Sequence, residues 1–164
     1  MKKITRVLLI ALALLMALST VSCSAKTPAA DEVNIPVQDI ADELMALPDQ
    51  FGALGFMGED VLTDLIGLDF SMLDEYSLND AMMNVHAHVL YVAKVKDEGD
   101  MDSVKAAFQK RLELMQASFE RYLPEQYDLA MNGKIEVNGK YILLVISWDS
   151  QLVVDTFNEL LTAA

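Results

Sequence analysis

The segment KIEVNGKYILLVISW at residues 134–148 carries the clearest signal for a fold in the chain. Its two strand-like runs flank Asn138-Gly139, a pair that tolerates the positive φ angles of a type I′ turn. Apolar and polar residues alternate over residues 134–138, as in an edge strand with one face in water. Residues 141–148 are largely apolar, as in a central strand that is covered on both faces. The segment therefore predicts a β-hairpin with an outer and an inner strand.

Two further strands and a long helix are expected before the hairpin. Residues 81–86 and 88–95 have strand-like composition, and apolar residues then recur at the three-and-four spacing of one helix face. This apolar stripe consists of Val104, Phe108, Leu112, Met115, Phe119 and Tyr122. We expect the helix to start at a cap on Asp100 or Asp102 and to end at Leu123.

A second helix follows the hairpin, so the order strand, strand, helix occurs twice. Asp149 or Ser150 can cap this helix. Its inward-facing side chains are expected to be Val153, Phe157, Leu160 and Leu161. The two strand-strand-helix units then cover residues 80–123 and 133–162, approximately.

Two shorter helices are expected in front of these units. Apolar residues recur at helical spacing over residues 37–47 and stop at Pro48, and residues 59–66 form a short helix that ends at Gly67. The predicted fold class is α+β, with a four-stranded antiparallel sheet built from the two units. The apolar strands belong in the centre, which gives the order 1-2-4-3. The long helix should cover one face of the sheet and the N-terminal helices the other.

Residues 1–22 follow the three-part plan of a secretory signal. Lys2, Lys3 and Arg6 form a positive region, and the twelve residues 7–18 are all apolar. A membrane-spanning helix needs about 20 apolar residues, so this run is short for a permanent span. The alternative is a cytoplasmic protein with a buried N-terminal helix and an incidental cysteine.

Cys23 is the only cysteine of the chain, so it has no partner for an intrachain disulfide. Small Ser22 directly precedes it, and this boundary resembles the lipobox of bacterial lipoproteins, although Thr20 stands where that motif usually has Leu, Val or Ile. The resemblance implies signal cleavage between Ser22 and Cys23 and attachment of a diacylglyceryl and palmitate anchor to Cys23. It also implies a location at the outer face of the bacterial cell membrane.

The charge of the chain restricts its partners. Removal of the three basic residues of the signal changes the formal net charge from −13 to −16. Residues 27–93 contain thirteen acidic residues and neither lysine nor arginine. Such a chain repels phosphate backbones, so nucleic acid is excluded as a partner. The acidic surface is interpreted as solubilising, with a site for a basic partner or a cation as the alternative.

The mature chain divides into a tether and one domain. Residues 23–38 are rich in alanine, proline and polar residues and show no sustained apolar period, so they are interpreted as a flexible tether. Residues 39–164 are enough for a single domain with its own core.

The motifs KVKD, SFERYLPEQY and NGKYILLVIS lie within residues 60–161. Over this range the chain resembles a family of exported bacterial lipoproteins that carry the domain of unknown function 4358. The family has no established activity, so the resemblance implies no catalytic residue. The sequence His86-Ala87-His88 lies outside what the family implies.

His86 and His88 are the candidates for chemistry. If a strand continues through both, their side chains share one face and could bind one metal ion together with carboxylates. A solvated turn or edge is the other interpretation, and it is favoured because the chain has no further histidine. The acidic run at residues 97–102 lacks the spacing of a calcium loop and is interpreted as a helix cap.

The sequence contains no nucleophile elbow, phosphate loop, nucleotide fingerprint or zinc-protease helix. We therefore expect a non-catalytic module without a cofactor, held at the membrane through Cys23, that binds an envelope protein or peptide through its acidic surface or a sheet edge. The alternative is a metal-dependent hydrolase that uses His86 and His88 with carboxylates.

Overall fold

A computed structural model describes residues 34–163 of the chain. The predicted signal, its cleavage between Ser22 and Cys23 and the lipid on Cys23 lie outside the described residues. The described part contains a five-stranded antiparallel sheet in the order β1-β2-β3-β5-β4. The strands are β1 (Leu54–Gly55), β2 (Leu73–Ala81), β3 (Val89–Val95), β4 (Lys134–Asn138) and β5 (Tyr141–Ile146).

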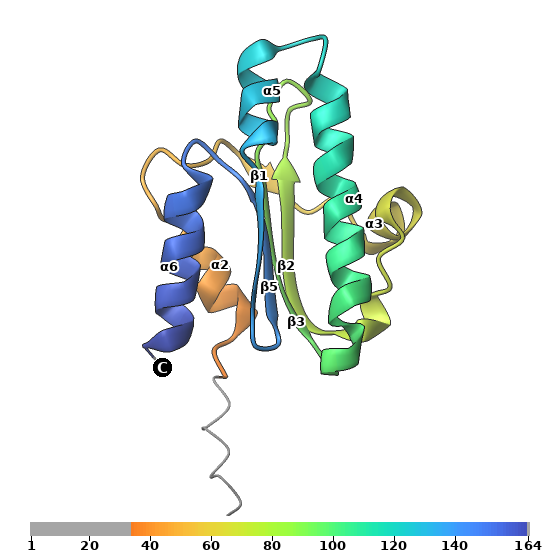
Figure 1. Ribbon diagram of the computed structural model, residues 1–164, viewed down its shortest axis with the longest axis vertical. Coiled ribbons are helices and arrows are strands. Elements are labelled where there is room, and N and C mark those ends of the chain that lie inside the picture. Colours follow the sequence, from red (N-terminus) through yellow and green to blue (C-terminus); the bar gives the residue numbers. More distant parts are fainter. Residues whose placement is uncertain (1–33, 164) are drawn as a thin grey trace, which may run out of the picture. The chain divides into compact units, whose positions relative to one another are not determined.

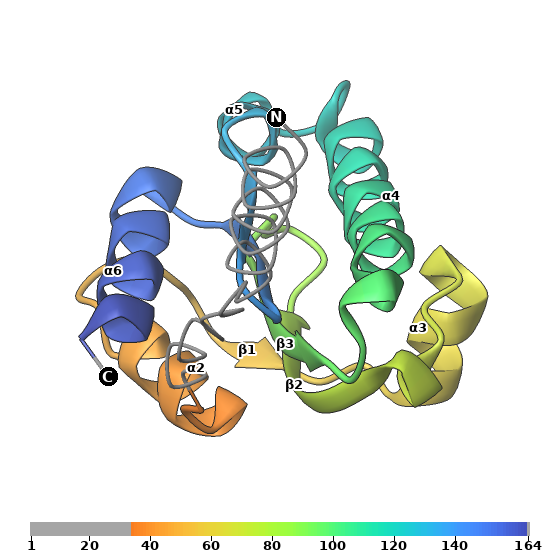
Figure 2. The same ribbon diagram turned by 60° about the horizontal axis from the view of Figure 1, so that its bottom comes forward.

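Helices cover both faces of this sheet. They are α2 (Val37–Met45), α3 (Glu59–Ile66), α4 (Met101–Phe119), α5 (Pro124–Met131) and α6 (Ser150–Thr162). Helices α2 and α6 lie on one face, and α3 and α4 lie on the other, as Figure 1 and Figure 2 show. The expectation that both N-terminal helices share a face is therefore wrong for α3, whose Leu62 and Ile66 belong to the same apolar cluster as the buried side of α4.

The two central strands explain why the sheet needs both layers. Every residue of β3 and β5 is buried. Successive side chains alternate between faces, so Tyr91 joins the cluster under α4, whereas Leu90 and Val92 join the cluster under α2 and α6. The prediction of two apolar central strands is confirmed. The predicted order 1-2-4-3 also describes how the four long strands β2, β3, β4 and β5 are arranged.

The first predicted strand is misplaced. The strand β2 ends at Ala81, and residues 82–88 form a loop rather than the expected strand at 81–86. The apolar residues of that loop, Met82 and Met83, are 72% and 55% exposed, so their composition indicated a strand that the chain does not form. The sheet also has five strands instead of four, because the two-residue strand β1 pairs with the end of β2.

The hairpin β4–β5 is confirmed, but its turn lies one residue later than predicted. Asn138 pairs with Tyr141, so Gly139 and Lys140 form the two-residue loop. Gly139 has a φ of 58°, whereas Asn138 and Lys140 do not have positive φ. A type I′ turn requires positive φ at both central residues, and glycine at the first one is typical of a type II′ turn. The type I′ assignment is therefore wrong.

Two helix boundaries also differ from the prediction. The long helix ends at Phe119, which leaves Tyr122 67% exposed instead of buried. Pro124 then occupies the first turn of α5, where its missing N–H costs nothing. A short 3-10 turn (η2, Glu98–Asp100) precedes α4, and no side chain caps that helix. The predicted cap of α6 is confirmed, because the Asp149 carboxylate accepts a hydrogen bond from the Leu152 N–H at 3.0 Å.

The folded part of the chain begins before residue 39. The hydroxyl of Tyr141 accepts a hydrogen bond from the Ile35 N–H and donates one to the Ile35 carbonyl. Val37 is 1% exposed and its N–H donates to the Glu75 carboxylate at 2.8 Å. The last residues of the expected tether are thus part of the domain. Among residues 34–163 no helix combines the length and apolar character needed to cross a bilayer.

Candidate functional site

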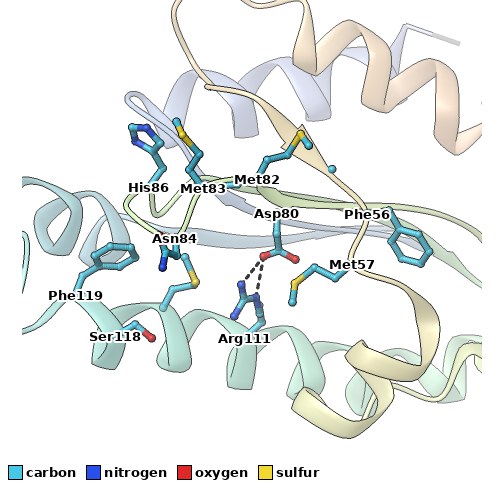
Figure 3. Close-up of a pocket in the computed structure, with 13 residues that line it drawn as sticks. Phe56, Met57, Asp80, Met82, Met83, Asn84, His86, Arg111, Ser118 and Phe119 are labelled. Carbon is cyan, nitrogen blue, oxygen red and sulfur yellow. Dashed lines mark hydrogen bonds and ion pairs between the residues drawn. The ribbon is translucent and has the colours of Figure 1, made fainter.

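A pocket of about 500 Å³ opens beside the edge of the sheet where β1 meets the end of β2. One wall comes from the segment that begins in β1, the second from the loop at residues 82–86 and the third from α4 (Figure 3). The large apolar side chains that line it are Phe56, Met57, Met82, Met83, Met115 and Phe119. This volume lies within the range of about 300–1,000 Å³ that is usual for ligand sites.

A buried ion pair forms part of the lining. Arg111 donates to one carboxylate oxygen of Asp80, from Nε at 2.9 Å and from Nη2 at 2.6 Å (Figure 3). The other carboxylate oxygen accepts a hydrogen bond from the Tyr91 hydroxyl. Asp80 is 3% exposed, so its charge depends on these two partners rather than on water. The pair joins α4 to β2 and β3.

The position of each partner follows from the strand and helix periods. Asp80 lies in β2 on the face that α4 covers, and Tyr91 lies on the same face of β3, where its ring packs edge-on against Phe108 at 5.4 Å between centroids. Burial, and then the negative charge of Asp80, raise the pKa of the Tyr91 hydroxyl far above its usual value. Tyr91 therefore remains a neutral hydrogen-bond donor to the carboxylate.

These three residues were not predicted from the sequence. A signal exists at Arg111, which lies one residue before Leu112 and three after Phe108, on the buried side of α4. A basic residue within an apolar helix stripe needs a buried acidic partner. The acidic residues of β2 are candidates for that partner, because no basic residue lies near them in the sequence.

The rim of the pocket exposes large apolar side chains. Phe56 is 48% exposed and Met57 40%, and Met82 and Met83 on the opposite wall are more exposed still. Neighbouring Val85 is 38% exposed. Contiguous exposed apolar surface around a pocket is typical of interaction sites, whereas isolated exposed apolar residues are not informative. Methionine adapts its shape to different partners because its side chain is unbranched and polarizable.

His86 lines the same pocket as the ion pair, and the buried His88 ring lies beside the His86 ring. Their rings lie nearly parallel, with centroids 5.8 Å apart and an interplanar angle of 23°. The His88 ring also meets Phe51 and Trp148 edge-on, at 6.3 Å and 5.6 Å between centroids. Among the described residues, neither nitrogen of His88 nor Nδ1 of His86 has a hydrogen-bond partner, although all three atoms are buried.

The environment of His88 disfavours its charged form. The side chain is 2% exposed, and burial lowers its pKa, with a smaller contribution from neighbouring His86. The two rings lie together, but in a loop and not in the continuous strand that the metal hypothesis assumed. The favoured interpretation of a solvated turn is wrong for His88, because its side chain is buried. No group of three or more His, Cys, Asp or Glu side chains within residues 34–163 is arranged to hold a metal ion. Carboxylates therefore do not complete the site of the hydrolase alternative in the described part.

The fold and the site define a small α+β domain with a surface pocket that has a methionine and phenylalanine rim and a buried ion pair in its lining. The chain belongs to the family described as Domain of unknown function (DUF4358), which matches residues 56–147. This range runs from the start of the first pocket wall to the end of β5, and it includes Asp80, Arg111 and both histidines. No curated protein and no solved structure matches the chain.

Proposed function

We propose that the protein is a non-catalytic binding module, anchored by a lipid on Cys23 at the outer face of the bacterial cell membrane. The observation that carries the proposal is the apolar rim of the pocket, which remains exposed around a buried ion pair. Its partner is a protein or peptide of the cell envelope that inserts an apolar side chain into the pocket.

The exposure of the rim favours a protein or peptide over a small molecule. A small ligand inside the pocket would cover Met115 and Phe119, but Met82 would keep most of its 72% exposure. A partner surface laid across the opening would bury both the rim and the pocket wall. The Arg111 guanidinium has N–H groups beyond those that bind Asp80, and these can donate to a carbonyl of the partner. The net charge of −13 favours a basic partner through electrostatic steering.

The paired state of Asp80 argues for binding rather than catalysis. A general base needs a carboxylate oxygen within reach of a substrate proton. Both oxygens of Asp80 already accept hydrogen bonds, one from Arg111 and one from Tyr91. The carboxylate is therefore best explained as a structural acceptor that holds Arg111 beside the pocket.

The lipid anchor rests on the N-terminal sequence. A single acyl chain binds membranes only marginally, whereas two chains hold a protein stably. A diacylglyceryl group on Cys23 would supply two chains, and we expect Cys23→Ala to abolish lipid incorporation and signal release. Mass spectrometry of the mature N-terminus tests this part. An unmodified first residue or a retained Met1 would contradict it.

Peptide selection tests the binding surface. The full chain with Cys23→Ser is presented to a displayed peptide library, and the affinities of the selected peptides are measured by fluorescence anisotropy. We expect Met57→Asp to weaken binding at least about tenfold, because it places a charge in an apolar contact. Leu152→Asp, at a residue of α6 that is also 40% exposed, is the matched control and should have no effect. Equal effects of both variants, or no selected peptide, would contradict the proposal.

A further inference from the structure

We infer that His86, His88 and Met83 form a binding site for a soft monovalent metal ion, Cu(I). His86 and Met83 line the same pocket as the ion pair, but their side chains lie on the side of the loop away from Arg111 (Figure 3). The site differs from the carboxylate-assisted site that the sequence suggested, because its third ligand is a thioether. The inference does not depend on the proposed binding function.

The unsatisfied imidazole nitrogens are the first observation. Buried polar side-chain atoms nearly always have a hydrogen-bond partner, so each exception calls for a physical explanation such as a bound ion. His88 is 2% exposed, and neither of its ring nitrogens has a partner among the described residues. Nδ1 of His86 is in the same situation. Three nitrogen atoms on two adjacent rings thus have no hydrogen-bond partner among the described residues. Each imidazole therefore has a lone pair available for a metal ion.

The distance between the rings is the second observation. Two imidazoles that share one metal ion at about 2.0–2.1 Å from each nitrogen have ring centroids about 5 to 6 Å apart. The His86 and His88 centroids are 5.8 Å apart, within this range. The rings are nearly parallel, with an interplanar angle of 23°, so the His86 ring at the rim must rotate for both rings to direct a nitrogen at one ion.

The local turn supplies the third ligand. The His86 N–H donates to the Met83 carbonyl at 3.1 Å, which closes a tight turn and holds residues 83 and 86 together. Figure 3 shows the Met83 side chain and the His86 ring on the same side of the loop, away from Arg111. Both side chains line the same pocket wall. Met83 is 55% exposed, so its sulfur can rotate toward the rings without disturbing the core.

The chemistry of this set selects the ion. Thioether sulfur is a soft ligand that favours Cu(I), and imidazole also suits copper. Zinc prefers four ligands from histidine, thiolate and carboxylate, and the described residues bring no acidic side chain into a group with both histidines. Phe51 and Trp148 pack edge-on against the His88 ring, which is 2% exposed. Such apolar shielding is suited to a monovalent ion with few ligands.

Competition with a chromogenic Cu(I) chelator tests the inference. The full chain carries Cys23→Ser, because a free thiol would itself bind Cu(I), and the titration is performed without oxygen. We expect one Cu(I) per chain. Loss of an outer-shell partner costs about 10- to 100-fold in metal affinity, so Met83→Leu and His86→Gln should each weaken binding at least as much. Met131→Leu, at a 52% exposed methionine of α5, is the matched control and should leave the affinity unchanged.

The outcomes separate this inference from the proposed function. Absence of stoichiometric Cu(I) in the Cys23→Ser chain would overturn the inference, as would equal affinities of Met83→Leu and Met131→Leu. Tighter binding of Zn(II) than of Cu(I) would also overturn it. Circular dichroism of each variant confirms that the fold is retained, and the exposed position of Met83 keeps the test valid even if a histidine variant unfolds. Met57→Asp, which tests the peptide site, should not change the affinity for Cu(I).

Discussion

Replacing Arg111 by methionine should destabilise the protein by about 3–5 kcal/mol, because it leaves the Asp80 carboxylate buried without its counter-ion. The side chains are 11% and 4% exposed, so solvent screens this ion pair little. Replacing both partners by apolar residues removes the uncompensated charge. We therefore expect Asp80→Leu combined with Arg111→Met to cost far less than the sum of the two single changes, with a coupling of about 2 kcal/mol or more.

The Tyr91 hydroxyl complicates this comparison in a predictable way. It loses its acceptor when Asp80 is replaced, and an unpaired buried donor costs about 1–3 kcal/mol. Adding Tyr91→Phe to the double variant should recover part of that loss. Asp74, which is 52% exposed and 3.8 Å from Lys94, provides the surface control, and Asp74→Asn should cost about 1 kcal/mol or less. Urea denaturation followed by circular dichroism gives each free energy of unfolding. Additive single effects would refute the buried-pair argument.

Three further variants test the fold and its dependence on pH. Gly139→Val should lower the free energy of unfolding by about 1 kcal/mol or more, because φ is 58° at this residue. Gly99→Val, at an open position without positive φ, is the control and should lower it less. Equal losses in urea denaturation would refute the turn assignment. Phe108→Ala should lower the free energy of unfolding by about 3–5 kcal/mol, because Phe108 is buried, and Tyr122→Ala by about 0.5 kcal/mol or less, because Tyr122 is exposed. Similar losses would mean that α4 turns a different face to the sheet. The lowered pKa of His88 means that the unfolded chain binds the proton more readily, so the melting temperature should fall as the pH drops below about 6.5. His88→Gln should flatten that part of the pH profile, and an unchanged slope would contradict the assignment.

The central strands could be predicted because a continuous run of apolar residues in a sheet indicates a strand that is buried on both faces. Residues at successive positions of β3 and β5 point to opposite faces, so both faces must be covered. The hairpin was predictable for a similarly local reason, since glycine at a two-residue loop restricts the turn. The position of its turn was not, because pairing of Asn138 with Tyr141 depends on the register of the whole strand.

The strand β2 was missed because its polar side chains form hydrogen bonds with residues far away in the sequence. Glu75 accepts a hydrogen bond from Val37, 38 residues away in the sequence, and Asp80 binds Arg111, 31 residues away. No local pattern reveals such partners. The apolar loop that follows β2 provided a stronger strand signal than β2 itself, although Met82 and Met83 contribute to the pocket rim and not to the core. Apolar patterns in a sequence thus locate buried strands well, but they do not distinguish those strands from apolar residues that are exposed at a pocket rim.

In the candidate site, too, local features were predictable and contacts between distant segments were not. The spacing of the two histidines predicted a shared face only if a strand runs through both; their rings are adjacent, but they lie in a loop. Predicting the ion pair of Asp80 and Arg111 requires knowing which helix covers which face of the sheet, and local sequence patterns do not reveal this. Arg111 within the apolar stripe of α4 was the available indication of a buried acid.

Photocrosslinking in intact cells tests the central claim that the methionine-rimmed pocket is the binding surface. A photoreactive phenylalanine analogue replaces Phe56 at the rim or, as the control, Leu152 on α6, which is 40% exposed. We predict that the Phe56 position captures one defined envelope protein, that Met57→Asp removes the adduct, and that the Leu152 position captures none of it. Capture of the same partner from Leu152, or an adduct that persists with Met57→Asp, would contradict the proposed function.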